Sequence, residues 1–199
     1  MKNLLVKAQI LVVASFLAFG CTPVPQHSVT RIDPNQQTDL SGRWNDTDSR
    51  LVAEEMSKDA LGRAWRGNFV NSRKKNPTVI VGIITNKSHE HIEAETFIKD
   101  IQREFINSGL VRVVQNSELR EALRKERGDQ QQFASPETQK KFGRELGADY
   151  MIFGTINSIV DTYQSKKVVY YQVNLELADL ETNELVWIGE KKIKKFINN

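Results

Sequence analysis

The sequence predicts an α/β fold in which one mixed β-sheet packs with about four helices. Two nearly continuous apolar runs, at residues 78–84 and 150–156, are typical of strands that are covered on both faces. Helical patterns lie before and between these runs, so the first strands should be parallel and joined by right-handed crossovers. The alternating residues 169–177, followed by a turn and another strand pattern, predict a C-terminal antiparallel meander.

The first helix is predicted over residues 48–71. Its apolar residues recur every four positions and form one face, although Gly62 and Gly67 weaken the pattern. The sequence Asn76-Pro77 then ends the helix. We therefore expect one amphipathic helix before the first strand, residues 78–84.

The second helix, predicted over residues 92–108, has the clearest apolar stripe in the chain. Gly109 fits the left-handed position that follows a last helical turn. A short strand is predicted at residues 110–114. The stripe recurs at helical spacing and consists of Ala94, Phe97, Ile98, Ile101, Phe105 and Ile106.

Two more helices are predicted before the second long strand. Ser117 can cap the first of them, and the polar residues 128–132 should interrupt the helical pattern. Ser135 and Pro136 suit the N-cap and the first position of the next helix, which should end at Gly147. This arrangement gives four helices in all.

The C-terminal part is predicted to be rich in strands. Residues 169–177 alternate between apolar and polar side chains, which indicates one buried face and one solvated face. A turn is predicted at residues 181–183, with Asn183 in the left-handed conformation. Residues 185–195 should return as an edge strand, because their lysines suit an exposed edge.

The N-terminal residues are typical of a secretion signal. Lys2 and Lys7 precede the apolar residues 10–17, which are too short for a spanning helix. Cys21, the only cysteine, follows and ends a segment that resembles a lipobox, in which the cysteine is lipidated and becomes the first mature residue. We therefore expect Cys21 to carry N-palmitoyl and S-diacylglycerol groups.

The lipobox differs from the usual pattern at two positions. Ala18 and Phe19 stand where leucine and a small residue are preferred, whereas Gly20 fits. The alternative is an ordinary signal peptide with an incidental cysteine. A single cysteine cannot form an internal disulfide, so it is not present as a covalent staple.

These patterns divide the chain into three parts. We expect a signal peptide at residues 1–20, a lipidated cysteine with a flexible tether at residues 21–47, and a globular α/β domain at residues 48–199. The tether is polar and contains prolines, and it could reach roughly 85–90 Å if fully extended. Without residues 1–20 the net charge falls from +3 to about +1, because Lys2 and Lys7 are lost, so charge gives no support for nucleic-acid binding.

Candidate motifs for chemistry are weak. Residues 82–88 follow a strand but lack the glycine that precedes the lysine of a phosphate loop. His89, Glu90, His91 and Glu93 could bind a metal, although a polar surface loop is the simpler interpretation. We therefore predict no catalytic residues, no metal and no cofactor, and no small-molecule substrate.

Three further groups of charged residues stand out in the sequence. Glu54 and Glu55 lie on the solvent-exposed side of the first predicted helix. Asp161 is an isolated acid, and one acid does not make a catalytic site. The pairs Lys191-Lys192 and Lys194-Lys195 are usually a solvated edge. They could also contact an acidic partner or anionic head groups.

Four segments together resemble the LpoB family, which consists of outer-membrane lipoproteins that activate a bifunctional class A penicillin-binding protein. The resemblance extends from about residue 39 to residue 196, and its most distinctive part is residues 39–50. The later segments also resemble the N-terminal domain of TolB. The sequences are DLSGRWNDTDSR at 39–50, GADYMIFGTI at 147–156, YQVNL at 171–175 and DLETNELVW at 179–187.

The resemblance implies a lipid-anchored protein that faces the periplasm from the outer membrane and regulates peptidoglycan synthesis and cell shape. It implies no catalysis by the lipoprotein itself. Family members dock on a small accessory domain of the synthase and raise its activity. Thr22 fits outer-membrane sorting, because the usual signal for inner-membrane retention is an aspartate after the cysteine.

One departure and two alternatives accompany this interpretation. The tether is shorter than the proline-rich tether of the best-known family members. A secretion or assembly role, resembling the curli-secretion lipoprotein, would need additional membrane-crossing strands that the sequence does not offer. An envelope enzyme would have to use His89 and His91.

Overall fold

The structure is a computed structural model that describes residues 28–133 and 147–198. Residues Gln37–Asn199 form one compact unit, and the described residues 28–36 belong to a separate unit. Within residues 28–36, the main-chain N–H groups of Asn35 and Gln36 donate to Asp33. The helix predicted from Ser135 lies outside the described residues.

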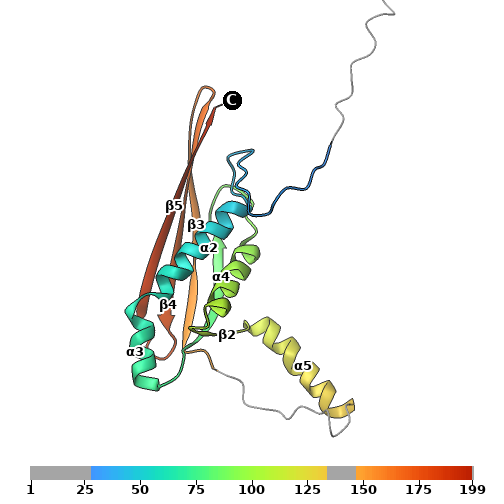
Figure 1. The fold of residues 1–199 in the computed structure, drawn as a ribbon, viewed down its shortest axis with the longest axis vertical. Helices are drawn as coiled ribbons and strands as arrows, with labels where there is room; N and C mark the ends of the chain where they lie inside the picture. Colours follow the sequence, from blue (N-terminus) through green and yellow to red (C-terminus); the bar gives the residue numbers. More distant parts are fainter. Residues whose placement is uncertain (1–27, 134–146, 199) are drawn as a thin grey trace, which may run out of the picture. The chain divides into compact units, whose positions relative to one another are not determined.

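The main unit contains a five-stranded mixed sheet, which confirms the predicted fold class (Figure 1). The strand order is β2-β1-β3-β4-β5, and β1 pairs in parallel with both β2 and β3. The strands β3, β4 and β5 form the predicted antiparallel meander. Four helices, α2 to α5, are described with this sheet.

The predicted first helix is two helices, α2 (Asp46–Leu61) and α3 (Ala64–Arg73). The prediction of one continuous helix was therefore wrong. Gly62 caps the end of α2, and Arg63 is extended, with φ −85° and ψ 162°. This break redirects α3 so that Trp65 packs edge-to-face on the strand residue Tyr150.

The next elements are β1 (Thr78–Asn86), α4 (Ala94–Ser108) and β2 (Arg112–Val114). Gly109 follows α4 with φ 65°, as predicted. Ile106 departs from the predicted apolar stripe, because its side chain is 60% exposed. Phe97, Ile101 and Phe105 are fully buried.

The helix α5 (Ser117–Phe133) is longer than predicted. Asn116, not Ser117, accepts the hydrogen bond of the first turn, from the N–H of Leu119. The helix continues through residues 128–132, which were predicted to break it. Three glutamines, which are good helix formers, occupy positions 130–132, so the single Gly128 is not enough to end the helix.

The three meander strands are β3 (Tyr150–Tyr163), β4 (Lys166–Asp179) and β5 (Leu185–Asn198). Asn183 in the turn before β5 has φ 61°, as predicted, and β5 is an edge strand. The alternation predicted in β4 is confirmed, because the five apolar residues predicted to face the core are at most 1% exposed; they are Val169, Tyr171, Val173, Leu175 and Leu177.

The core lies between one face of the sheet and the helices α2 and α4. These two helices contact each other, α2 also contacts β5, and α4 contacts β1 (Figure 1). The buried residues of α2, α4 and the strands form one hydrophobic cluster. No helix in the described ranges is long and apolar enough to cross a membrane.

Candidate functional site where the N-terminal segment meets strand β5

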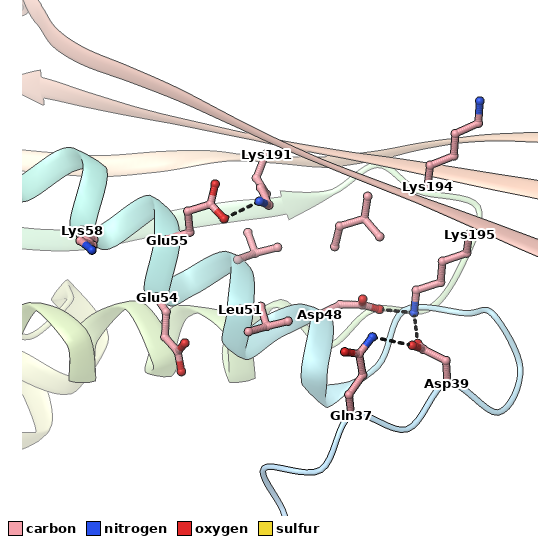
Figure 2. A pocket seen from close by; sticks show the side chains of 12 residues that line it. Gln37, Asp39, Asp48, Leu51, Glu54, Glu55, Lys58, Lys191, Lys194 and Lys195 are labelled. Carbon is pink, nitrogen blue, oxygen red and sulfur yellow. Dashed lines mark hydrogen bonds and ion pairs between the residues drawn. The ribbon is translucent and has the colours of Figure 1, made fainter.

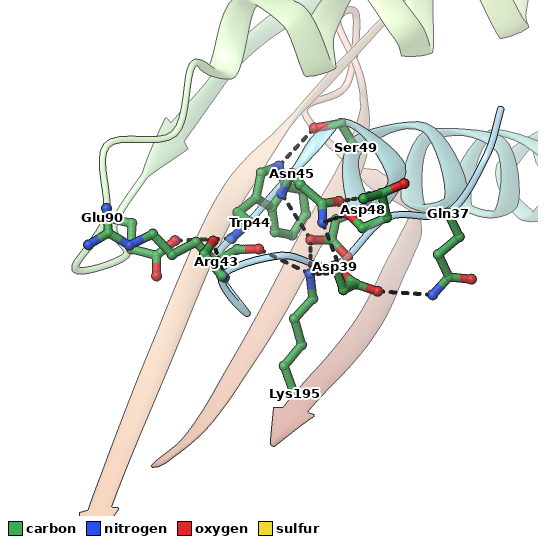
Figure 3. Close-up of polar contacts among 11 residues, drawn as sticks. Gln37, Asp39, Arg43, Trp44, Asn45, Asp48, Ser49, Glu90 and Lys195 are labelled. Carbon is green, nitrogen blue, oxygen red and sulfur yellow. Dashed lines mark hydrogen bonds and ion pairs between the residues drawn. The ribbon is translucent and has the colours of Figure 1, made fainter. Parts of the chain in front are cut away.

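Residues 37–45, called the strap below, precede α2 and contact the C-terminal end of β5 (Figure 3). They lie in the range that the sequence predicts to be tether. Gly42 has φ 68°, and a Cβ atom there would lie 2.5 Å from the side chain of Ile197. The strap therefore approaches β5 too closely for a larger residue at position 42.

Lys195 of β5 binds the strap and α2 with one ammonium group. Its Nζ lies 2.7 Å from Asp39 Oδ1, 2.6 Å from Asp48 Oδ2 and 3.0 Å from the carbonyl oxygen of Arg43. The side chain is only 11% exposed. The sequence predicted this lysine as part of an exposed edge, and it is instead a largely buried ion-pair centre.

The electrostatics of this cluster favour the charged forms. The hydrogen bond from Lys195 is the main cause that lowers the pKa of Asp39 to about 2. Burial lowers the pKa of Lys195, but the hydrogen bonds to Asp39 and Asp48 outweigh burial, so that its pKa is raised overall. The cluster is therefore a structural clasp, because one ammonium group binds a carboxylate of the strap and a carboxylate of α2.

The N-terminus of α2 is built into the same cluster. The side chain of Asn45 accepts the N–H of Asp48, and Asp48 accepts the N–H of Asn45, each at 3.0 Å. This is a capping box, which satisfies main-chain donors that a helix start leaves unpaired. Asp48 thus caps the helix and binds Lys195 at once.

Trp44 fastens the strap to the core. Its indole Nε1 donates to Ser49 Oγ at 2.7 Å, and its main-chain N–H donates to Glu90 Oε2 at 3.1 Å. Its ring packs edge-to-face on Tyr171 and Phe97, with centroid distances of 5.5 and 6.4 Å. Aromatic pairs of this kind add roughly 0.5–1.5 kcal/mol beyond area burial.

The structure brings together two of the four residues of the metal hypothesis. Glu90 Oε2 accepts the main-chain N–H of Trp44, and Glu90 Oε1 lies 3.5 Å from Nε2 of His89. The exposed His89 also contacts Ser158 Oγ through Nδ1. His91 is exposed as well. Within the described ranges, no three metal-binding side chains come together.

Glu90 and Tyr171 form a buried polar pair beneath Trp44. Glu90 Oε1 and the Tyr171 hydroxyl are both buried, and neither has a hydrogen-bond partner among the described residues. Burial, assisted by the adjacent Glu90 carboxylate, raises the pKa of Tyr171 above its ordinary value. A neutral phenol of this kind supports packing and does not indicate catalysis.

A groove of about 570 Å³ runs between α2 and β5 beside the clasp (Figure 2). Both signs of charge line it, and Lys191 is ion-paired with Glu55 across it. Glu54 and Lys58 are exposed on α2 at its wall. The paired charges satisfy one another, so the groove fits the packing of β5 on α2 better than a substrate site.

The other residues singled out in the sequence lie apart from the clasp. Gly82 is inside β1, and Lys87 follows the strand in a loop, so the segment is no phosphate cradle. Asp161 is exposed near the end of β3. Cys21 lies outside the described residues, so its lipidation stays a prediction.

Sequence reasoning missed the clasp because its members are far apart in the chain. Asp39 and Lys195 are separated by 156 positions. The spacing of Asn45 and Asp48 is a local signal that could have placed the start of α2 earlier. The pairing with Lys195 depends on the register of β5, which no local pattern supplies.

A family model described as the peptidoglycan-synthase activator LpoB matches residues 48–193. No curated protein matches the chain. The LpoB C-terminal domain from Escherichia coli aligns at 15% identity and TM-score 0.44, covering 74% of this chain and 99% of that chain. The LpoB C-terminal domain from Salmonella enterica aligns at 14% identity and TM-score 0.35, covering 65% and 92%.

A third solved structure is similar at the same level. The lipoprotein GNA1162 from Neisseria meningitidis aligns at 15% identity and TM-score 0.39, covering 63% of this chain and 86% of that chain. All three structures are less than 25% identical to this chain, with TM-scores below 0.5.

Proposed function

The chain belongs to the peptidoglycan-synthase activator LpoB family, and we propose that it binds and activates a bifunctional class A penicillin-binding protein from the outer membrane. The observation that carries this proposal is the family match over residues 48–193. This range extends from α2 into β5 and so includes nearly the whole described domain. The proposed role is regulatory, without catalysis by the chain itself.

The proposed anchor is the lipidated Cys21, which would hold the protein at the outer membrane facing the periplasm. Each buried methylene of an acyl chain contributes about 0.8 kcal/mol to membrane binding. Because the strap contacts β5 and α2, the span available between anchor and domain would be residues 22–36. Fully extended, this segment would reach roughly 50 Å.

Activation is proposed to work by preferential binding. A partner can shift a synthase toward its active conformation only if it binds that conformation more tightly. The domain is suited to this role because the clasp and the core hold its surfaces in one arrangement. A rigid partner loses little conformational entropy when it docks.

The proposal is tested by binding between the purified chain, from residue 22 onward, and the detergent-solubilised class A synthase of the same bacterium. We expect saturable binding that is lost when the accessory domain of the synthase is deleted. Equal binding to both forms of the synthase would place the contact elsewhere on it. An absence of binding to the intact synthase would contradict the proposed function.

A further inference from the structure

The outer part of the meander carries a surface that the core does not use. Residues 157–163 of β3, 166–172 of β4 and 192–198 of β5 are called the ribbon below. Val169 and Tyr171 point to the buried side of β4. Because side chains alternate along a strand, Val168, Tyr170 and Gln172 point to the opposite side. This opposite side of the ribbon, away from the core that α2 and α4 cover, is called the open face.

Strand register places large apolar side chains together on the open face. Ile159 pairs with Tyr170, and Val168 pairs with Phe196 on neighbouring rows. Ile159 is 66% exposed and Phe196 is 65% exposed, while Tyr163 at the end of β3 is 73% exposed. Contiguous exposed apolar side chains on a soluble domain commonly mark an interaction site.

Lysines surround this apolar centre. Tyr170 pairs with Lys194, Lys192 lies in the next open-face row on one side, and Lys166 lies two rows away on the other. Lys194 is exposed and forms no ion pair with any residue in the described ranges, and Lys192 pairs with Glu190 at 2.6 Å. Asp161 is the one acid in the four rows from Asn157 to Tyr163. The open face is therefore basic around an apolar centre.

The other lysines of β5 are neutralised on the opposite side. Lys191 pairs with Glu55, and Lys195 pairs with Asp39 and Asp48. The chain thus supplies carboxylates to the lysines that face the helices. It leaves Lys194 on the open face without one, so this lysine is available to a carboxylate of a partner.

Polar side chains extend the surface along β4. The Tyr170 hydroxyl donates to Gln172 Oε1 at 3.1 Å, and Gln172 Nε2 donates to Asn174 Oδ1 at 3.1 Å. These bonds hold the three side chains in one arrangement before any partner arrives. Preorganised side chains lower the entropic cost of docking.

We propose that the open face of the ribbon is a docking surface for a folded protein domain with an apolar centre ringed by carboxylates. This inference rests on the proposed function, in which that domain belongs to the synthase. An apolar centre with a charged rim is the usual anatomy of a protein interface. An anionic membrane would attract the lysines and bury the apolar side chains. The hydrogen-bonded series of Tyr170, Gln172 and Asn174 favours a protein partner, which can pair with these amides in a fixed arrangement.

The test measures binding to the synthase for Phe196→Ser and Lys194→Glu. We expect each change to weaken binding at least tenfold while the thermal unfolding midpoint stays within a few degrees. Ile106→Ser and Lys58→Glu are the matched controls, because both residues are exposed on helices of the core side. The controls should bind within twofold of the unaltered chain.

Further outcomes separate the possible failures. If the unaltered chain binds and both ribbon variants bind equally well, the docking surface is elsewhere and the proposed function survives. If the unaltered chain does not bind, the proposed function and this inference both fail. Should Phe196→Ser not fold, Tyr163→Ser replaces it, because Tyr163 is the more exposed side chain.

A membrane arm completes the test. Phosphatidylglycerol vesicles replace the synthase, and binding of the unaltered chain is compared with that of Lys194→Glu. Negligible binding of both supports a protein partner. Strong vesicle binding that Lys194→Glu abolishes would overturn the inference in favour of an anionic lipid surface.

Discussion

Lys195 joins three parts of the chain through one ammonium group. Asp39 comes from the strap, Asp48 from the first turn of α2, and Lys195 itself from β5. Removing one partner of a buried ion pair leaves an uncompensated charge, which is the costly part of such a change. The partly exposed Asp39 moderates this cost, because water can solvate it.

We predict that Lys195→Met lowers the free energy of unfolding by about 2–3 kcal/mol. Lys194→Met is the matched control, because this neighbouring lysine is exposed, and its change should stay within about 0.5 kcal/mol. Chemical denaturation of both variants measures the difference. Equal stability of the two variants would mean that the clasp contributes nothing to folding.

The clasp also predicts an acid dependence. Asp39 has a pKa of about 2 in the folded chain, below its ordinary value of 3.8. Because this pKa is lower in the folded chain, ionised Asp39 stabilises the fold at pH values above 3.8. This stabilisation is lost as the pH falls toward 2. The unaltered chain should therefore lose more stability than Lys195→Met between pH 5 and about 2, as measured by denaturation across this range. Parallel losses would contradict the assignment to Asp39.

At the scale of elements, Gly154 of β3 lies close to the backbone of β4. A Cβ atom there would lie 2.1 Å from the carbonyl oxygen of Asn174 and 2.7 Å from the side chain of Leu175. Gly154 also follows the shift in the register between β1 and β3. The close backbone of β4 cannot move without disturbing the meander.

We predict that Gly154→Ala destabilises the domain by at least about 2 kcal/mol, because overpacking against backbone is poorly relieved. Gly67→Ala is the matched change in α3, where an added Cβ atom meets nothing within 4 Å. This second change should stabilise the helix by about 0.5–1 kcal/mol. Thermal unfolding of the two variants should show shifts of opposite sign.

The elements that local patterns define were predictable from sequence. The alternation in β4 identified its buried face, because a strand with one solvated side has a period of two. The break at Gly62 was not predicted, because two rows of apolar residues at a spacing of four continue through it: Met56, Ala60 and Ala64, and Leu61, Trp65 and Phe69. Helical periodicity predicts which residues face the core, but it does not predict whether the helix is interrupted.

The clasp and the open face depend on contacts between distant residues. The lysines of β5 read as one exposed charged edge in the sequence, yet the structure divides them between two sides. A one-residue difference in strand register would exchange those sides. The sequence therefore predicted a lysine-rich edge strand, but it could not show which lysines form ion pairs with the strap and α2 and which stay exposed.

At the scale of the whole molecule, the proposed anchor at Cys21 determines where the domain can act. We predict that Cys21→Ser yields a protein that no longer fractionates with membranes, because the acyl chains supply the proposed membrane affinity. Fractionation and metabolic lipid labelling of both forms measure this. A serine variant that remains in the membrane fraction would contradict the lipoprotein proposal.

The most direct test of the central claim is the rate of glycan polymerisation from lipid II by the class A synthase of the same bacterium. The rate is measured with and without the chain from residue 22 onward, at saturating concentration. We predict a several-fold rise that requires the accessory domain of the synthase. An unchanged rate, with a folded chain bound to the synthase, would contradict the proposal that this protein is an activator.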